Sequence, residues 1–162
     1  FSKKGIIPVK KLGRYGYIGM DGKELEKPIF KHRLDFNSND LALAETDEGY
    51  GVVNVRMEHV TNLNYPYGKK AEDGAFLLGR YENDFGVVNG EGKMSIEPGT
   101  YARTTYLEGF AMILAKTKDG FYTIIDINGR VIVPKSESII VSEGVAIIKN
   151  GGEPQFLNLS TL

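Results

Sequence analysis

The stretch Asp84-Phe85-Gly86-Val87-Val88-Asn89, followed at once by Gly90-Glu91-Gly92-Lys93, decides the fold of this chain. An aromatic residue, a glycine and two apolar residues predict a short β-strand, and the glycine-rich segment after them predicts a tight turn. Related stretches recur at Tyr15-Gly16-Tyr17-Ile18, Tyr50-Gly51-Val52-Val53-Asn54 and Tyr122-Thr123-Ile124-Ile125-Asp126. The chain therefore repeats one structural unit.

A second apolar strand precedes each of these stretches and recurs with a fixed period. Its openers are Gly5, Asp40, Gly74, Gly109 and Gly144, with spacings of 35, 34, 35 and 35 residues. Such a period is typical of an array whose units bury their apolar faces on one another. We expect a single array with units at residues 5–39, 40–73, 74–108 and 109–143 and a partial fifth unit at 144–162.

Each unit contains a third strand, which a tight turn joins to the second. The turns hold Gly22, Gly92 and Gly129, and the third strands end near Pro28, Pro98 and Pro134. Because a glycine turn reverses the chain and a proline ends a strand, the sequence predicts three-stranded antiparallel units followed by irregular stretches. The predicted fold is an all-β array of about 35-residue units in a solenoid-like stack. The alternative is a small five-bladed β-propeller, whose blades usually have four strands and about 40–45 residues.

The recurring pair of an aromatic residue and a glycine has a predicted packing role. Glycine leaves the backbone of a strand bare, and an aromatic ring from a neighbouring strand can cover it. We therefore expect a ring over Gly51 and another over Gly86, and a continuous stripe of aromatic rings along the array. The predicted repeat-stacking residues are Tyr15, Gly16, Tyr50, Gly51, Phe85, Gly86 and Tyr122.

These features together resemble the bacterial WG-repeat family, also called KWG repeats. The best matches are Arg14-Tyr15-Gly16-Tyr17-Ile18 with Gly22-Lys23, Asp84-Phe85-Gly86-Val87-Val88 with Gly92-Lys93, and the pair Glu108-Gly109-Phe110-Ala111 and Glu143-Gly144-Val145-Ala146. The chain has no tryptophan, so Tyr, Phe or another residue stands wherever the family has Trp. The resemblance implies repetitive β-structure and a scaffolding or recognition role in an exported or surface-associated bacterial protein, without catalytic residues.

The composition predicts no catalytic, cofactor-binding or metal-binding residues. The 162 residues carry a net charge of −1 and include no cysteine. This charge favours neither nucleic acid nor an anionic membrane, and a thiolate nucleophile or metal ligand is excluded. The two histidines, His32 and His59, lie in charged stretches without a regularly spaced second ligand. We expect a protein that is not an enzyme, with no cofactor and no membrane span.

Aromatic residues outside the predicted stripe are candidates for contacting a partner. They are Phe36, Tyr65, Tyr67, Tyr101 and Tyr106. Tyrosine is enriched at protein interfaces, because its ring is apolar and its hydroxyl can form a hydrogen bond. We also expect at least one terminus, above all the N-terminal edge strand from Gly5 to Lys11, to add to the sheet of a partner or to pack against further parts of the same polypeptide.

The expected function is a non-catalytic protein-binding or scaffolding module, with another protein as its partner or as a subunit of a larger complex. The alternatives are the binding domain of a larger enzyme and a carbohydrate-binding module, for which a glycan would be the ligand. The family resemblance implies an exported location, in the periplasm, at the outer-membrane surface or outside the cell. The start of the sequence shows no signal segment.

Overall fold

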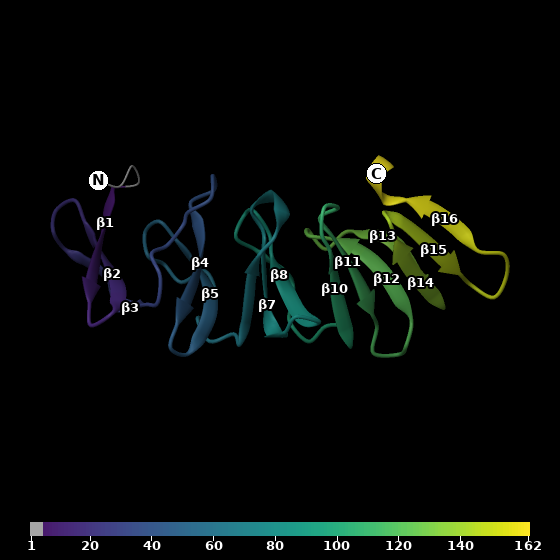
Figure 1. Cartoon of the computed structure of the whole chain (residues 1–162), viewed down its shortest axis with the longest axis horizontal. Coiled ribbons are helices and arrows are strands. Elements are labelled where there is room, and N and C mark those ends of the chain that lie inside the picture. The colour runs from purple at the N-terminus through teal and green to yellow at the C-terminus, as the bar shows by residue number, and fades with distance from the viewer. Residues whose placement is uncertain (1–4) are drawn as a thin grey trace.

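The computed structural model describes residues 5–162 as short antiparallel strands and two single-turn 3₁₀ helices. The strands form four sheets, which follow one another in a row from the N-terminus to the C-terminus (Figure 1). The predicted all-β repeat array is thus confirmed. The first and last strands, β1 (Ile6–Lys11) and β16 (Gln155–Asn158), lie toward opposite ends of an open row in Figure 1, as in a solenoid-like stack and unlike a closed five-bladed propeller. The elements are β1 (Ile6–Lys11), β2 (Arg14–Gly19), β3 (Glu24–Phe30), β4 (Leu41–Thr46), β5 (Gly49–Asn54), β6 (Tyr67–Lys70), η1 (Glu72–Gly74), β7 (Phe76–Tyr81), β8 (Asp84–Val88), β9 (Met94–Ile96), β10 (Arg103–Leu107), β11 (Met112–Lys116), β12 (Tyr122–Asp126), β13 (Val131–Ser136), β14 (Ser138–Ser142), β15 (Val145–Lys149), β16 (Gln155–Asn158) and η2 (Leu159–Thr161).

The two central sheets each hold four strands, in the orders β6-β7-β8-β9 and β10-β11-β12-β13, where the sequence predicts three. The additional strands, β6 and β10, lie in stretches that the sequence predicts to be irregular. Each pairs with the first strand of the next unit, as β14 does with β15. Every such sheet therefore combines the end of one unit with the beginning of the next.

The sheets stack face to face, and the core lies between them. The five-stranded sheet β1-β5 divides into two layers, because β3 and β4 share a single residue pair in register, Phe30 with Thr46. The layers are thus β1–β3, β4–β5, β6–β9, β10–β13 and β14–β16, and one buried apolar cluster fills each of the four spaces between them. In β8, for example, Val87 faces the following layer and Val88 the preceding one. Because both faces of a central sheet are buried, its strands read as continuous apolar runs.

An asparagine or aspartate at the end of the second strand holds the tight turn that follows. Asn89 accepts hydrogen bonds from the backbone N–H groups of Glu91 and Lys93, at 3.0 and 3.1 Å. Asn54 and Asp126 accept the equivalent pairs of bonds in the second and fourth units. The recurrence of Asn or Asp in the repeat thus has a physical cause, since this side chain satisfies two backbone donors of the turn.

The glycine of the aromatic-glycine pair is covered by backbone, so the expectation of a ring over it is wrong. A Cβ at Gly86 would collide with the carbonyl oxygen of Ile96 and the backbone nitrogen of Pro98. A Cβ at Gly16 would lie 2.6 Å from the carbonyl oxygen of Glu26. The third strand crosses here with a register shift and leaves no room for a side chain. Glycine is required because a backbone, and not a ring, approaches it.

Gly51 is crowded in the same way, by the segment that replaces a third strand in the second unit. The atoms nearest to a Cβ at this position belong to Asn62 and Leu63. An aromatic ring does cover a glycine elsewhere, because Tyr50 of β5 packs against Gly68 of β6 in the next sheet. The predicted packing of an aromatic ring over a glycine is therefore present, but at Gly68, where it joins two consecutive layers.

Candidate functional site

The four recurring aromatic residues lie in separate clusters and do not form a continuous stripe. Tyr15, Tyr50, Phe85 and Tyr122 each pack in a different apolar cluster, next to the layer that follows their own. The ring pairs recorded in residues 5–162 are Tyr17 with Phe30 and Tyr67 with Phe85, with centroids 6.2 and 6.4 Å apart. Neither pair joins two of the four recurring rings. These residues thus have equivalent roles in holding one layer to the next, without touching one another.

The last sheet presents an apolar face that no other described part of the chain covers. Ile140 pairs with Ile147 in register, and Ile147 pairs with Phe156, so the three side chains lie side by side across β14, β15 and β16. The exposed fraction is 60% for Ile140 and 68% for Phe156, whereas Ile147 is half-buried. We call these three residues the C-terminal face. Sequence reasoning missed it because the buried counterparts of Phe156 have the same apolar character.

The five aromatic residues predicted to contact a partner are all half-buried, and they do not form one exposed patch. Tyr67, Tyr101 and Tyr106 pack against the cluster between the two central sheets. Phe36 packs against the first cluster, and Tyr65 against the cluster between β4–β5 and β6–β9. Their rings therefore contribute to the core, although two of them also reach a surface groove.

That groove, which we call groove II, runs between the edge strands β6 and β10 and has a volume of about 590 Å³. Tyr67 and Tyr106 contribute to its walls, and Tyr81, which is 63% exposed, lies at its rim. Exposed polar side chains complete the lining, among them Lys69, Glu82, Asn83, Arg103 and Thr105.

A carboxylate beside groove II, that of Glu72, joins the third layer to the fourth. The Tyr106 hydroxyl donates a hydrogen bond to Oε1 of Glu72 at 2.5 Å, and the backbone N–H groups of Gly109 and Ala111 donate to the same oxygen at 3.0 and 3.3 Å. The Tyr106 hydrogen bond lowers the pKa of Glu72. Burial, followed by the bond to Glu72, raises the pKa of the Tyr106 hydroxyl. The bond is thus made between an ionised carboxylate and a neutral hydroxyl.

We expect Tyr106→Phe to lower the free energy of unfolding by about 1–3 kcal/mol at neutral pH, because a charge-assisted hydrogen bond is lost. Since the pKa of Glu72 is lowered by folding, this stabilisation is complete above the ordinary glutamate pKa and disappears as the pH falls through the folded-state value. The difference between the wild-type chain and the variant should therefore shrink in acid. Urea unfolding at neutral and acidic pH measures it.

Tyr101→Phe is the matched control for this experiment. Tyr101 packs against the same cluster, and within residues 5–162 its hydroxyl makes no hydrogen bond. Equal destabilisation by the two variants, or a Tyr106→Phe effect that does not change with pH, would contradict the role assigned to Glu72.

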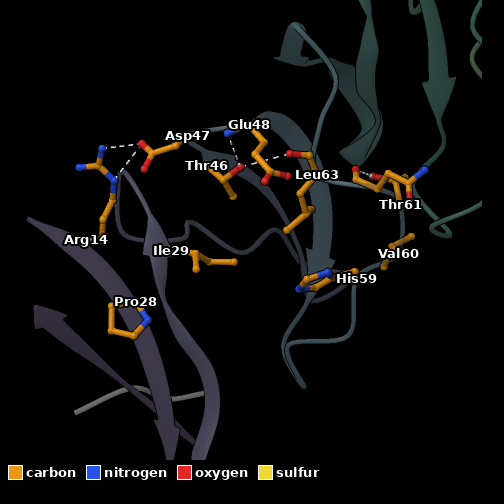
Figure 2. Close-up of a pocket in the computed structure, with 11 residues that line it drawn as sticks. Arg14, Pro28, Ile29, Thr46, Asp47, Glu48, His59, Val60, Thr61 and Leu63 are labelled. Carbon is orange, nitrogen blue, oxygen red and sulfur yellow. Dashed lines mark hydrogen bonds and ion pairs between the residues drawn. The ribbon is translucent and has the colours of Figure 1, made fainter.

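A second groove, groove I, separates the first two layers and has a volume of about 610 Å³ (Figure 2). An ion pair and a hydrogen bond join the two layers on either side of it. Arg14 of β2 pairs with Asp47 in the turn between β4 and β5, and Nε2 of His59 lies 2.7 Å from Oε2 of Glu26 in β3. The floor and walls also include Pro28, Ile29 and Leu63.

The histidines are placed as partners of carboxylates. His59 contacts Glu26, and Nε2 of His32 lies 3.5 Å from Oε1 of Glu45. Within residues 5–162, no three or more His, Asp or Glu side chains gather so as to hold a metal ion. In the same residues, no helix is long and apolar enough to cross a membrane.

Comparisons with known proteins show only distant structural likeness. No protein-family model matches the chain, and no curated protein matches its sequence. The computationally designed Ika4 protein aligns with a TM-score of 0.34 and 10% identity, over 78% of this chain and 92% of that one. Hsv2p of Kluyveromyces lactis aligns with a TM-score of 0.38 and 8% identity, over 97% of this chain and 59% of that one. The N-terminal domain of Nup159 aligns with a TM-score of 0.37 and 11% identity, over 97% of this chain and 41% of that one.

Proposed function

We propose that the chain is a non-catalytic scaffold module that binds a protein partner on its C-terminal face. The observation that carries this proposal is the position of Phe156. In the four preceding units, the first residue of the apolar pair in the second strand faces the next layer and is buried, with exposed fractions of 3%, 0%, 0% and 0% for Tyr17, Val52, Val87 and Ile124. Phe156 occupies the same place in the fifth unit and is 68% exposed.

The chemistry of this face suits a protein with an apolar docking surface. A phenylalanine and two isoleucines lie side by side across three strands. Contiguous exposed apolar residues of this kind mark interaction sites, and burial of one large apolar side chain contributes about 1.5–3 kcal/mol. A partner that covers this face would repeat the packing that holds the layers of the array together.

Affinity capture from cells that carry the protein tests this function. We expect a partner of fixed stoichiometry to bind the wild-type chain and to be lost with Phe156→Asp, which places a charge in the apolar contact. Val131→Asp is the control, because Val131 is an exposed apolar residue of β13 outside the C-terminal face. Capture of the same proteins by all three chains would refute the proposal.

The proposal extends to the setting that the WG-repeat resemblance implies, an exported or surface-associated bacterial assembly. The resemblance rests on the residues around Tyr15-Gly16 and Phe85-Gly86, whose glycines share one packing role in the fold. Protease treatment of source cells with a permeabilised outer membrane and an intact inner membrane should then degrade the chain. Full protection in such cells that are shown to contain it would count against this setting.

A second candidate function, saccharide binding, is favoured by groove II. Two tyrosine rings form part of its wall, a third is exposed at the rim, and polar side chains surround them. Rings combined with hydrogen-bonding groups suit the apolar faces and hydroxyl groups of a sugar. On a glycan array we expect binding that Tyr81→Ala weakens and Phe121→Ala, which truncates an exposed ring outside the groove, leaves unchanged. A signal no higher than background would exclude this function.

A further inference from the structure

We infer that the partner of the C-terminal face is a second copy of this chain, which docks head to tail through the outer face of its first layer. This inference rests on the function proposed above and specifies the occupant of the site. It follows from comparing what each layer presents to the layer before it.

Within the array, the face that each layer presents to the preceding one carries three apolar residues in fixed register. In the fourth unit they are Ile113 and Ala115 of β11 and Ile125 of β12, which pairs with Ile113. All three are 1% exposed or less and belong to the cluster between the third layer and the fourth. The equivalent residues are Ala42, Ala44 and Val53 in the second unit, and Phe76, Leu78 and Val88 in the third.

The first layer carries the same triplet, although no described residue precedes it as a layer. Ile7 and Val9 of β1 and Ile18 of β2 occupy the equivalent positions, and Ile7 pairs with Ile18 just as Ile113 pairs with Ile125. These residues are half-buried. We call them the N-terminal face. Residues 5–162 thus present, on their first and last layers, two complementary halves of the interface that they form four times internally.

Charges at the turns favour the same arrangement. Inside the array, an ion pair between Arg14 and Asp47 joins the hairpin turns of the first two layers. The corresponding turn of the last layer carries an exposed Glu153, and the first hairpin carries the exposed Lys11, which lies on the same face of β1 as Ile7 and Val9. When a second copy continues the stack by one step, Glu153 of one copy comes next to Lys11 of the other.

An interface between two different faces does not close on itself. Each docked copy leaves one N-terminal and one C-terminal face open, so that association continues into open chains of arrays. A face-to-face dimer would instead bring two C-terminal faces together and would leave the N-terminal face unused.

A complementation experiment tests the inference. Phe156→Asp blocks the C-terminal face and Val9→Asp blocks the N-terminal face, and each retains the other face. Sedimentation velocity should show concentration-dependent association of the wild-type chain and of Val131→Asp, weakened about 30-fold in either blocked variant. Mixing the two blocked variants should give a one-to-one complex that does not grow further.

Circular dichroism melting first establishes that each variant folds. A charge reversal on the surface, Glu153→Lys, then tests the same interface without changing the core. We expect Glu153→Lys to weaken self-association roughly two- to fivefold, and Lys11→Glu in a second copy to restore it.

A wild-type chain that stays monomeric, or a mixture of blocked variants that does not associate, overturns the inference. Association lost with Phe156→Asp but kept with Val9→Asp also overturns it, in favour of a face-to-face dimer. A monomer whose capture of another protein depends on Phe156 refutes the second copy alone and leaves the proposed function standing.

Discussion

Phe85→Ala is expected to lower the free energy of unfolding by about 3–5 kcal/mol. The Phe85 side chain is 2% exposed and packs in the cluster between the two central sheets, beside the ring of Tyr67. The backbone N–H of Phe85 also donates to the Thr104 hydroxyl, at 3.0 Å, across the same interface. Truncating the ring leaves a cavity between layers that rigid sheets on both sides cannot fill.

The effect should reach beyond the mutated residue, because the stability of an array depends on the interfaces between its units. Weakening the central interface should allow the two halves of the chain to unfold at different denaturant concentrations, so that one transition becomes two. Chemical denaturation followed by circular dichroism measures this. Tyr122→Ala, at the half-buried equivalent position, should cost less, and Tyr81→Ala, on an exposed ring, should cost almost nothing. Equal midpoints for Phe85→Ala and Tyr81→Ala would contradict the packing role.

The period and the first two strands of each unit could be predicted because they depend on local sequence. A buried strand with apolar residues on both faces, such as β8, reads as a run of apolar residues bounded by turn signals. The turn after it is equally local, because Asn89 binds the backbone of residues two and four positions ahead. The second unit keeps this turn with Met57, at φ 63°, where the other turns have glycine. Its buried side chain compensates for the unfavourable backbone conformation.

The fourth strand could not be predicted, because its pairing is with the next unit. β10 contains no apolar run: Arg103 and Thr105 are exposed, and the residue between them is a buried threonine. This strand lies at the edge of its sheet. Contact with Lys116 and its neighbours in β11 determines that the segment is a strand. The role of Gly86 was similarly hidden, since Pro98, which crowds it, lies 12 residues along the chain, on the far side of a turn.

The sequence also predicts that the open ends of the array are strand edges, whereas the structure shows that they are sheet faces. Each sheet keeps two edge strands, so β1 is one edge among several and is not special in this respect. What distinguishes the last sheet is a face that no other residue among 5–162 covers, which leaves Phe156 exposed. This is why the proposed docking involves side chains of the C-terminal face, and not strand addition at Gly5 to Lys11.

Gly86→Val is expected to lower the free energy of unfolding by about 3 kcal/mol, at the upper end of the range for overpacked positions. Gly86 lies in the centre of β8, where a Cβ would overlap the carbonyl oxygen of Ile96 and the ring of Pro98. Neither group is the movable end of a side chain, so the third strand must shift to make room. Such a shift would break the pairing of Val87 with Ile96 and would disturb the clusters on both faces of the sheet.

Two comparisons separate crowding from the general cost of placing valine in a loop or a strand. Gly152→Val should leave the denaturation midpoint almost unchanged, because nothing lies within 4 Å of a Cβ at this exposed position. Gly86→Ala should already cost most of what Gly86→Val costs, because the Cβ itself meets the backbone. The fourth unit shows what accommodation requires: Thr123 stands at the equivalent position, and its hydroxyl donates to the carbonyl oxygen of Val133 at 2.6 Å. A Gly86→Ala variant as stable as the wild-type chain would show that β9 can move away from β8 as easily as β13 lies away from Thr123. The close approach of the backbone would then not be the reason for glycine at position 86.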